Sequence, residues 1–341
     1  NGITTAFDFT NPRLPWQTMI EGAKSGPTPE LRALDYLTRQ ADAKADAGLR
    51  HINAIPMDVT VGTDDEIFAR FAAAVAHDDG LDPRFRLGSA VFGAVQWSPR
   101  EDTAELEREA MRRHGVINEA HFLETREEVE LQRSKFEWID RGGLLGPDFI
   151  FGHFIQTTPE IIDRAAETGS RMSWQPASNG RLASGVADIP RMRAHGMSIG
   201  VGLDDQACTD ISDPWGNMRI GIFAVRGVTG DPVSMLPKDM LRFATLGSAE
   251  VIGVDDRVGS LQAGKYADFL VVDPKRPDIG PLWHPIDNYV LSCGPRNLKA
   301  VYVGGELVND NGVSTNPLAA EASAKLHEQL PALARSVGWP R

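Results

Sequence analysis

Strand-like and helix-like segments alternate through the first two-thirds of the chain, and this alternation limits the possible folds more than any other feature. Seven strands are expected, at residues 2–8, 49–56, 86–94, 116–123, 149–155, 171–175 and 198–203. Helices are expected between them, at residues 29–47, 66–76, 103–113, 125–140, 159–168 and 189–195. Such alternation predicts a parallel sheet with right-handed crossovers, either closed as a barrel or open and doubly wound.

Size and charge narrow the class of protein further. A chain of 341 residues can bury the core of one large α/β barrel or of two domains. The net charge of −12 and the pI of about 5.2 argue against nucleic-acid or anionic-membrane partners. No apolar run approaches the ~18 residues of a membrane span, and the first residues do not resemble a signal peptide. Cys208 and Cys293 are far apart, which indicates free thiols and a cytoplasmic protein.

Three of the expected strands end on side chains that can bind metal or transfer protons. His121 stands near the end of one strand and Glu124 follows it by three residues, at the start of the next helix. Another apolar run ends at His153, and a third ends at Asp204. Barrel enzymes bring catalytic groups together from the carboxyl ends of separate strands. The pattern therefore predicts a metal-dependent hydrolase.

Each of these residues also has a purely structural interpretation. A histidine on a buried strand is more often a packing residue than a ligand, and a carboxylate such as Glu124 is favoured in the first turn of any helix. Asp204 could cap the segment that follows it, and Asp205 beside it is a competing candidate. The joint pattern, rather than any single residue, favours a site.

The pattern changes from about residue 261 onwards. Residues 264–273 predict a turn and a buried strand, and residues 298–309 predict a β-hairpin around Gly304-Gly305. An Ala-rich tail, residues 317–336, is expected to be helical. We therefore expect a strand–helix unit at residues 1–258, a small β-rich lobe at 259–312 and a helical tail at 313–341.

Several motifs occur in an order and spacing that resemble a known family. They are the H-x-x-E of residues 121–124, Gly152-His153, the P-x-S-N of residues 176–179, Gly202-Leu203-Asp204 and the G-K-Y-A-D of residues 264–268. Together they resemble the amidohydrolase superfamily, in its cytosine-deaminase-like and chlorohydrolase-like branch, although that family more often shows G-T-D at the aspartate. The resemblance implies a TIM-type (β/α)8 barrel and a small β-sandwich lobe.

One motif of that family has no counterpart here. Its first barrel strand carries H-x-H, whereas no two of this chain's eight histidines are separated by one residue. Asn1 to Thr5 instead resembles the start of strand two, so residues 1–258 would supply strands two to eight. Two explanations are open: the sequence is a piece of a longer protein, which we favour, or it is a natural variant that lost the site.

The resemblance also implies roles for the site residues. His121 and Asp204 would bind one divalent metal ion, zinc first and iron second, together with the two absent histidines. The ion would lower the pKa of water towards ~7, Asp204 would accept the water's proton, and Glu124 would carry a proton to the substrate. His153 would hydrogen-bond to the reacting oxygen, or bind metal in a binuclear relative.

The substrate implied is a small aminated heterocycle that undergoes hydrolytic deamination. Alternatives are hydrolysis of a cyclic amide or of another C–N or C–Cl bond, and a metal-free relative that acts as a scaffold. Gln96, Trp97, Trp174 and Gln175 are candidates for lining the pocket or for packing, and Asn179 for positioning Asp204 or its loop. No Gly-rich phosphate-binding motif is found, so no nucleotide cofactor is expected, and a homodimer is possible.

Overall fold

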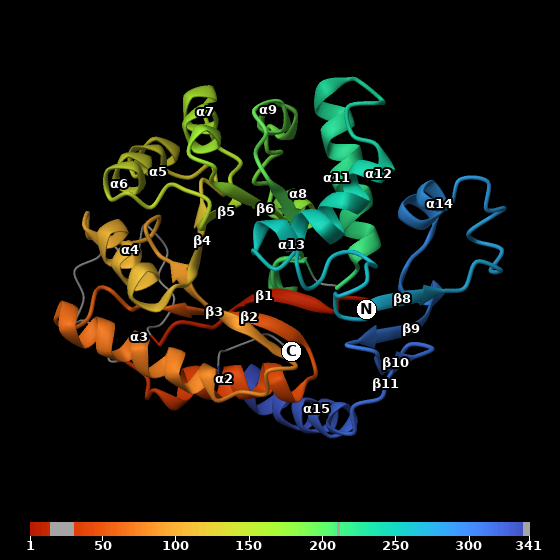
Figure 1. The fold of residues 1–341 in the computed structure, drawn as a ribbon, viewed down its shortest axis with the longest axis horizontal. Helices are drawn as coiled ribbons and strands as arrows, with labels where there is room; N and C mark the ends of the chain where they lie inside the picture. The colour runs from red at the N-terminus through yellow and green to blue at the C-terminus, as the bar shows by residue number, and fades with distance from the viewer. Residues whose placement is uncertain (14–30, 210–211, 337–341) are drawn as a thin grey trace.

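Seven parallel strands form one curled sheet in the computed structural model, which describes residues 1–13, 31–209 and 212–336. The strands pair in chain order, from β1 to β7. They are β1 (Thr5–Phe9), β2 (Arg50–Pro56), β3 (Arg86–Gly93), β4 (Ile117–Phe122), β5 (Phe149–His153), β6 (Arg171–Trp174) and β7 (Ile199–Val201). Helices cover the outer face of the sheet (Figure 1). The prediction of a TIM-type barrel that lacks one strand is confirmed, since β1 and β7 are the two edges of this sheet.

The helices between the strands arise where the apolar periodicity predicted them. They are α2 (Asp35–Asp46), α3 (Asp64–Asp79), α4 (Thr103–His114), α5 (Val129–Ser134), α6 (Phe136–Arg141), α7 (Pro159–Glu167) and α9 (Ile189–Ala194). The local sequence explains why α3 forms. Thr63 and Glu66 make a capping box at its start, and Ile67 and Phe71 face the sheet. These helices bury one apolar face each and leave the other in solvent.

The single helix expected at residues 125–140 is not found, and this prediction was wrong. The segment forms the two short helices α5 and α6, which meet at Lys135. Glu128 begins α5 in the left-handed conformation without a side-chain cap. The side-chain amide of Gln132 donates instead to the hydroxyl and carbonyl of Thr125, so Thr125 belongs to a hydrogen-bonded loop.

Several helices follow β7 in the chain. They are α10 (Gln206–Thr209), α11 (Pro214–Thr229), α12 (Pro237–Arg242), the π-helix η1 (Phe243–Gly247) and α13 (Ser248–Val251). Asp213 starts α11 by accepting hydrogen bonds from the amides of Trp215 and Gly216. Val201 on the outer edge of β7 donates its amide to the Ser248 hydroxyl, at 2.9 Å. The unpaired edge of β7 is therefore partly satisfied by a side chain.

The C-terminal lobe contains a four-stranded antiparallel sheet in the order β11-β10-β9-β8. Its strands are β8 (Phe269–Val272), β9 (Leu298–Val303), β10 (Glu306–Asp310) and β11 (Val313–Ser314), with α14 (Pro285–Ser292) beside them and α15 (Leu318–Ser336) after them. The expected hairpin is confirmed, with Gly304 and Gly305 both at positive φ in its turn. The domain boundaries at residues 258 and 312 stay predictions.

Cys208 and Cys293 are both free thiols, as predicted. None of the described helices combines the length and the apolar character that crossing a membrane would require.

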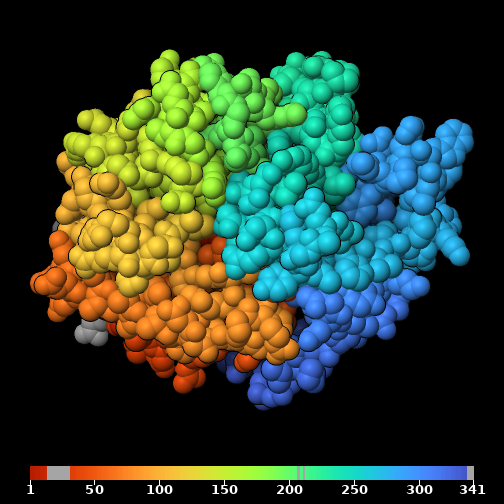
Figure 2. All heavy atoms as spheres, in the orientation of Figure 1, coloured from red at the N-terminus to blue at the C-terminus, as the bar shows by residue number. Residues whose placement is uncertain are grey.

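The barrel and the C-terminal lobe lie side by side, and the blue atoms of the lobe and tail adjoin the orange N-terminal part in Figure 2. A buried ion pair joins them: Arg50 on β2 and Asp268 before β8 are 3.1 Å apart, with side chains 2% and 5% exposed. The amide of Gly304 also donates to Asp268, at 2.7 Å, and the Arg50 guanidinium lies 3.9 Å from the ring centre of Tyr266. Asp268 therefore organises the contact between the two parts.

Replacing Asp268 by Asn should lower the free energy of unfolding by about 3–5 kcal/mol, because it leaves the Arg50 charge buried without a partner. Urea denaturation followed by circular dichroism measures the effect. Asp255→Asn, at an exposed position, is the matched control and should leave stability unchanged. A loss no greater in Asp268→Asn than in this control would contradict the role given to the ion pair.

Candidate active site

The four positions singled out in the sequence come together at the carboxyl ends of the strands. His121 lies in β4, Glu124 lies two residues beyond the end of that strand, His153 lies at the end of β5, and Asp204 lies just after β7. Ligand atoms of Glu124, His153 and Asp204 all lie within 4.8 Å of one another. The two nitrogens of His153 face the two carboxylates, with Nδ1 3.8 Å from Glu124 and Nε2 3.8 Å from Asp204. His121 lies beside this group, and its ring centre is 5.0 Å from that of His153.

Unusual backbone torsions aim these side chains. Leu123, His153, Phe154 and Asp204 all have positive φ, between +48° and +67°. This conformation is unfavourable for residues other than glycine and is concentrated at functional sites in proteins. In β5 the strict alternation of a strand would place His153 on the outer face, with Phe151. The left-handed turn at His153 brings its ring to the barrel mouth instead.

Burial and neighbouring carboxylates set the protonation of the site. Burial, and then the charges of Asp204 and Asp205, raise the pKa of Glu124 to about 7. Burial lowers the pKa of His121 and holds the pKa of His153 well below its usual value. Both imidazoles are therefore neutral near pH 7, which is the form that binds metal. Glu124 is poised to take up and release a proton near neutral pH.

Residues of α8 (Pro176–Arg181) orient His153 and Asp204. The amide nitrogen of Asn179 donates to His153 Nδ1 at 2.8 Å, which leaves the proton of the neutral ring on Nε2, facing Asp204. The hydroxyl of Ser178 donates to Asp204 Oδ2 at 2.5 Å. Asn179 thus positions His153 rather than Asp204, and Ser178, which the sequence analysis missed, has the role considered for Asn179.

The four residues proposed from the sequence to line the pocket differ in where they lie and in what they contact. The ring of Trp97 lies 5.4 Å from that of His121, whereas Trp174 is buried in the core outside the sheet and is a packing residue. Gln175 accepts a hydrogen bond from the amide of His153 at 3.0 Å. Gln96 is buried and accepts one from the amide of Leu123. Both glutamines therefore support the backbone of the site.

Glu119 is a buried carboxyl that the sequence analysis missed. It lies two residues before His121 on β4 and so shares its face of the strand. Burial, and to a smaller extent Asp204, raise its pKa to about 8 although Ser173 hydrogen-bonds to it. The period of two along β4 was the signal that could have identified it. Glu119 is therefore a second buried carboxyl group near the site whose pKa is raised.

The residues of this site fit a divalent metal ion. Imidazole nitrogens and carboxylate oxygens form a donor set that zinc and iron accept. His121 Nδ1 is buried and has no hydrogen-bond partner among the described residues. Asp204 also lies close to Asp205 and Cys208, but burial and these carboxylates raise the pKa of the Cys208 thiol to about 12. The imidazole–carboxylate group is therefore the stronger ligand set.

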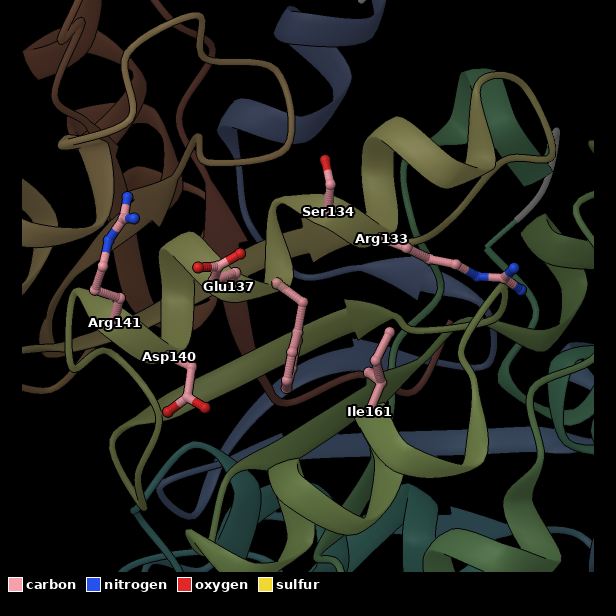
Figure 3. Close-up of a pocket in the computed structure, with 7 residues that line it drawn as sticks. Arg133, Ser134, Glu137, Asp140, Arg141 and Ile161 are labelled. Carbon is pink, nitrogen blue, oxygen red and sulfur yellow. The ribbon is translucent and has the colours of Figure 1, made fainter.

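A hollow of about 580 Å³ lies elsewhere, between α6 and the start of α7 (Figure 3). It is lined by Arg133, Ser134, Phe136, Glu137, Asp140, Arg141 and Ile161. Asp140 is already paired with Arg164, at 2.9 Å, and Arg133 donates to the carbonyl of Gln156. None of the four site residues lines this hollow, so it is separate from the barrel mouth.

Comparisons with known proteins agree with the motifs. A model of the amidohydrolase family matches residues 1–308. A 5-methylthioadenosine/S-adenosylhomocysteine deaminase of Syntrophobacter fumaroxidans is 30% identical over 204 residues, which are 58% of this chain and 47% of that protein. A 5'-deoxyadenosine deaminase of Methanopyrus kandleri is 28% identical over 86% of this chain and 69% of its own length.

Two further similarities are to a triazine hydrolase and to a solved deaminase structure. An S-triazine hydrolase of Gordonia rubripertincta is 27% identical over 85% of this chain and 60% of its own length. The crystal structure of an adenosine deaminase from Xanthomonas campestris with bound zinc matches with a TM-score of 0.80 at 24% identity, over 90% of this chain and 71% of that one. The chain spans about half of the first relative and 60–69% of the other two curated relatives.

Proposed function

The chain belongs to the amidohydrolase family, and from this premise we propose that it carries out metal-dependent hydrolytic deamination of an aminated heterocycle. The observation that carries the proposal is the position of Glu124, whose carboxyl group lies 3.8 Å from His153 and has its pKa raised to about 7. Deamination of an aromatic ring requires a group that protonates a ring nitrogen and later the departing amine. Glu124 has the place and the pKa for both transfers.

Each side chain of the site has its own role in the proposed reaction. His121 and Asp204 would hold the metal, with zinc as the first candidate and iron as the second. When bound, such an ion supplies activation of water at neutral pH. The carboxylate of Asp204 accepts the proton of the attacking water, and Glu124 transfers a proton to the substrate. His153, which keeps its proton on Nε2 because Nδ1 accepts from Asn179, donates a hydrogen bond to the oxygen where negative charge develops.

The substrate class follows from the relatives and from Trp97. The deaminases named above act on adenosine derivatives, and a planar ring of that kind can stack on an indole such as Trp97 beside His121. The similarity to an S-triazine hydrolase favours a second candidate function, the hydrolysis of a different leaving group from a heterocycle. Both candidates use the same residues and differ in the bond that breaks.

Ammonia release from a panel of purine nucleosides, pyrimidines and triazines tests the proposal. We expect ammonia from at least one aminated ring, loss of that activity with a chelator, and its return when zinc is added. Chloride or alkylamine release without ammonia would support the second candidate instead. A chain that turns over no substrate when metal is bound would contradict both.

A further inference from the structure

A buried ammonium group without a carboxylate partner lies close to the active site. Lys135, at the junction of α5 and α6, is 6% exposed. Its Nζ donates to the carbonyl oxygens of Gln96 at 2.7 Å, Ser98 at 2.8 Å and Val95 at 3.3 Å. No ion pair of Lys135 occurs among the described residues. A buried charge is costly unless hydrogen bonds compensate it, and here three protons meet three converging carbonyl groups.

The three carbonyl groups belong to the loop between β3 and α4, residues 94–98, which we call the β3–α4 loop. A buried carboxyl group, whose pKa burial raises to about 7, holds this loop from the other side. Glu107 on α4 accepts from the amide of Ala94 at 2.6 Å, and its other oxygen accepts from Asn118 at 2.8 Å. The β3–α4 loop is therefore fixed between the carboxyl group of Glu107 and the ammonium of Lys135.

The side chains of this loop reach the active site. Gln96 accepts a hydrogen bond from the amide of Leu123, the left-handed residue between His121 and Glu124. The next residue, Trp97, places its ring against His121. The loop therefore contacts the segment that carries both the predicted metal ligand and the predicted proton carrier.

We propose that Lys135 is a positioning residue for the active site: by gathering the carbonyl groups of the β3–α4 loop, it fixes Gln96 against Leu123 and Trp97 against His121, and so aims Glu124. Loss of the ammonium would leave three buried carbonyl groups without their donor, so Lys135 also stabilises the loop that it positions. The link from Lys135 to Leu123 follows from the contacts above. Only the catalytic consequence rests on the proposed function.

Lys135→Met tests the link, because it keeps most of the length of the side chain and removes all three N–H donors. Hydrogen exchange followed by mass spectrometry should show faster exchange in peptides that cover residues 94–98 and 121–124. Peptides from β6 and β7 should keep their protection. Lys135→Arg, which retains the charge and its donors, should restore protection at residues 121–124 at least in part. Lys275→Met, at an exposed position, is the matched control and should exchange like the unmodified chain.

Turnover gives a second readout. In Lys135→Met, kcat should fall by about 10- to 100-fold, since small misplacements of a reacting group cost that much. KM should change much less than kcat, and the control should keep normal turnover. If the unmodified chain shows no turnover, the proposed function fails, whereas the exchange experiment still decides whether Lys135 positions the 121–124 segment.

Gln96→Met keeps the proposal testable if Lys135→Met does not fold, because it removes only the acceptor for the Leu123 amide. Faster exchange at residues 121–124 in this variant, with residues 94–98 still protected, would support the link. Unchanged exchange at residues 121–124 in either folded variant would overturn the proposal. Equal loss of protection across the whole sheet in a folded Lys135→Met would also overturn it, since that result indicates a purely structural role.

Discussion

Replacing Glu124 by Gln is expected to lower kcat by about 10²- to 10⁴-fold, the usual contribution of a general acid–base group, and to leave the metal content unchanged. Gln has nearly the same shape as Glu but cannot carry a proton. The carboxyl group of Glu124 is largely buried, and its pKa is raised to about 7, so its protonation is what the substitution removes. Ammonia release gives the rate, and plasma mass spectrometry gives the metal content.

Glu127→Gln is the matched control for this prediction, because Glu127 is an exposed carboxylate three residues further along the chain. It should keep both activity and metal. Normal turnover in Glu124→Gln would remove Glu124 from the mechanism. Loss of metal in the same variant would instead make Glu124 a ligand, which its place in the Glu124–His153–Asp204 cluster allows.

The strands of the barrel could be predicted from the sequence because each is a short apolar run between clear breaks. The segments predicted at residues 86–94 and 49–56 correspond to β3 and β2 within about one residue at each end. The break between α5 and α6 could not be predicted, because it depends on Gln132 bonding to the loop before α5 and on Lys135 reaching across to another loop. Local periodicity does not contain such contacts.

The sequence was sufficient to predict which strand ends carry the site residues. It was not sufficient to predict the side-chain contacts between them. His121, His153 and Asp204 follow from the rule that parallel strands bring their carboxyl ends to one side of the sheet. The contacts of Ser178 with Asp204 and of Asn179 with His153 could not be foreseen, since they depend on the short helix α8. The inward turn of His153 depends on a left-handed torsion that the sequence does not specify for a residue other than glycine.

The choice between Asp204 and Asp205, which the sequence left open, leads to the second large effect. Asp204 Oδ2 faces His153 and accepts from Ser178, whereas Asp205 is exposed and accepts from the amide of Cys208 at 2.9 Å. Asp204→Asn should therefore lose bound metal on dialysis. Its turnover should fall by more than about 100-fold, because even partners outside the ligand shell contribute up to that factor.

Asp205→Asn is the matched variant, with the same chemical change one residue away. It should keep its metal and most of its turnover, because its carboxylate serves the backbone of α10 rather than the His153 group. Metal analysis and ammonia release on the two variants, prepared side by side, decide between the aspartates. Loss of metal in Asp205→Asn with retention in Asp204→Asn would reverse the assignment, and the left-handed turn at Asp204 would then serve to present its neighbour.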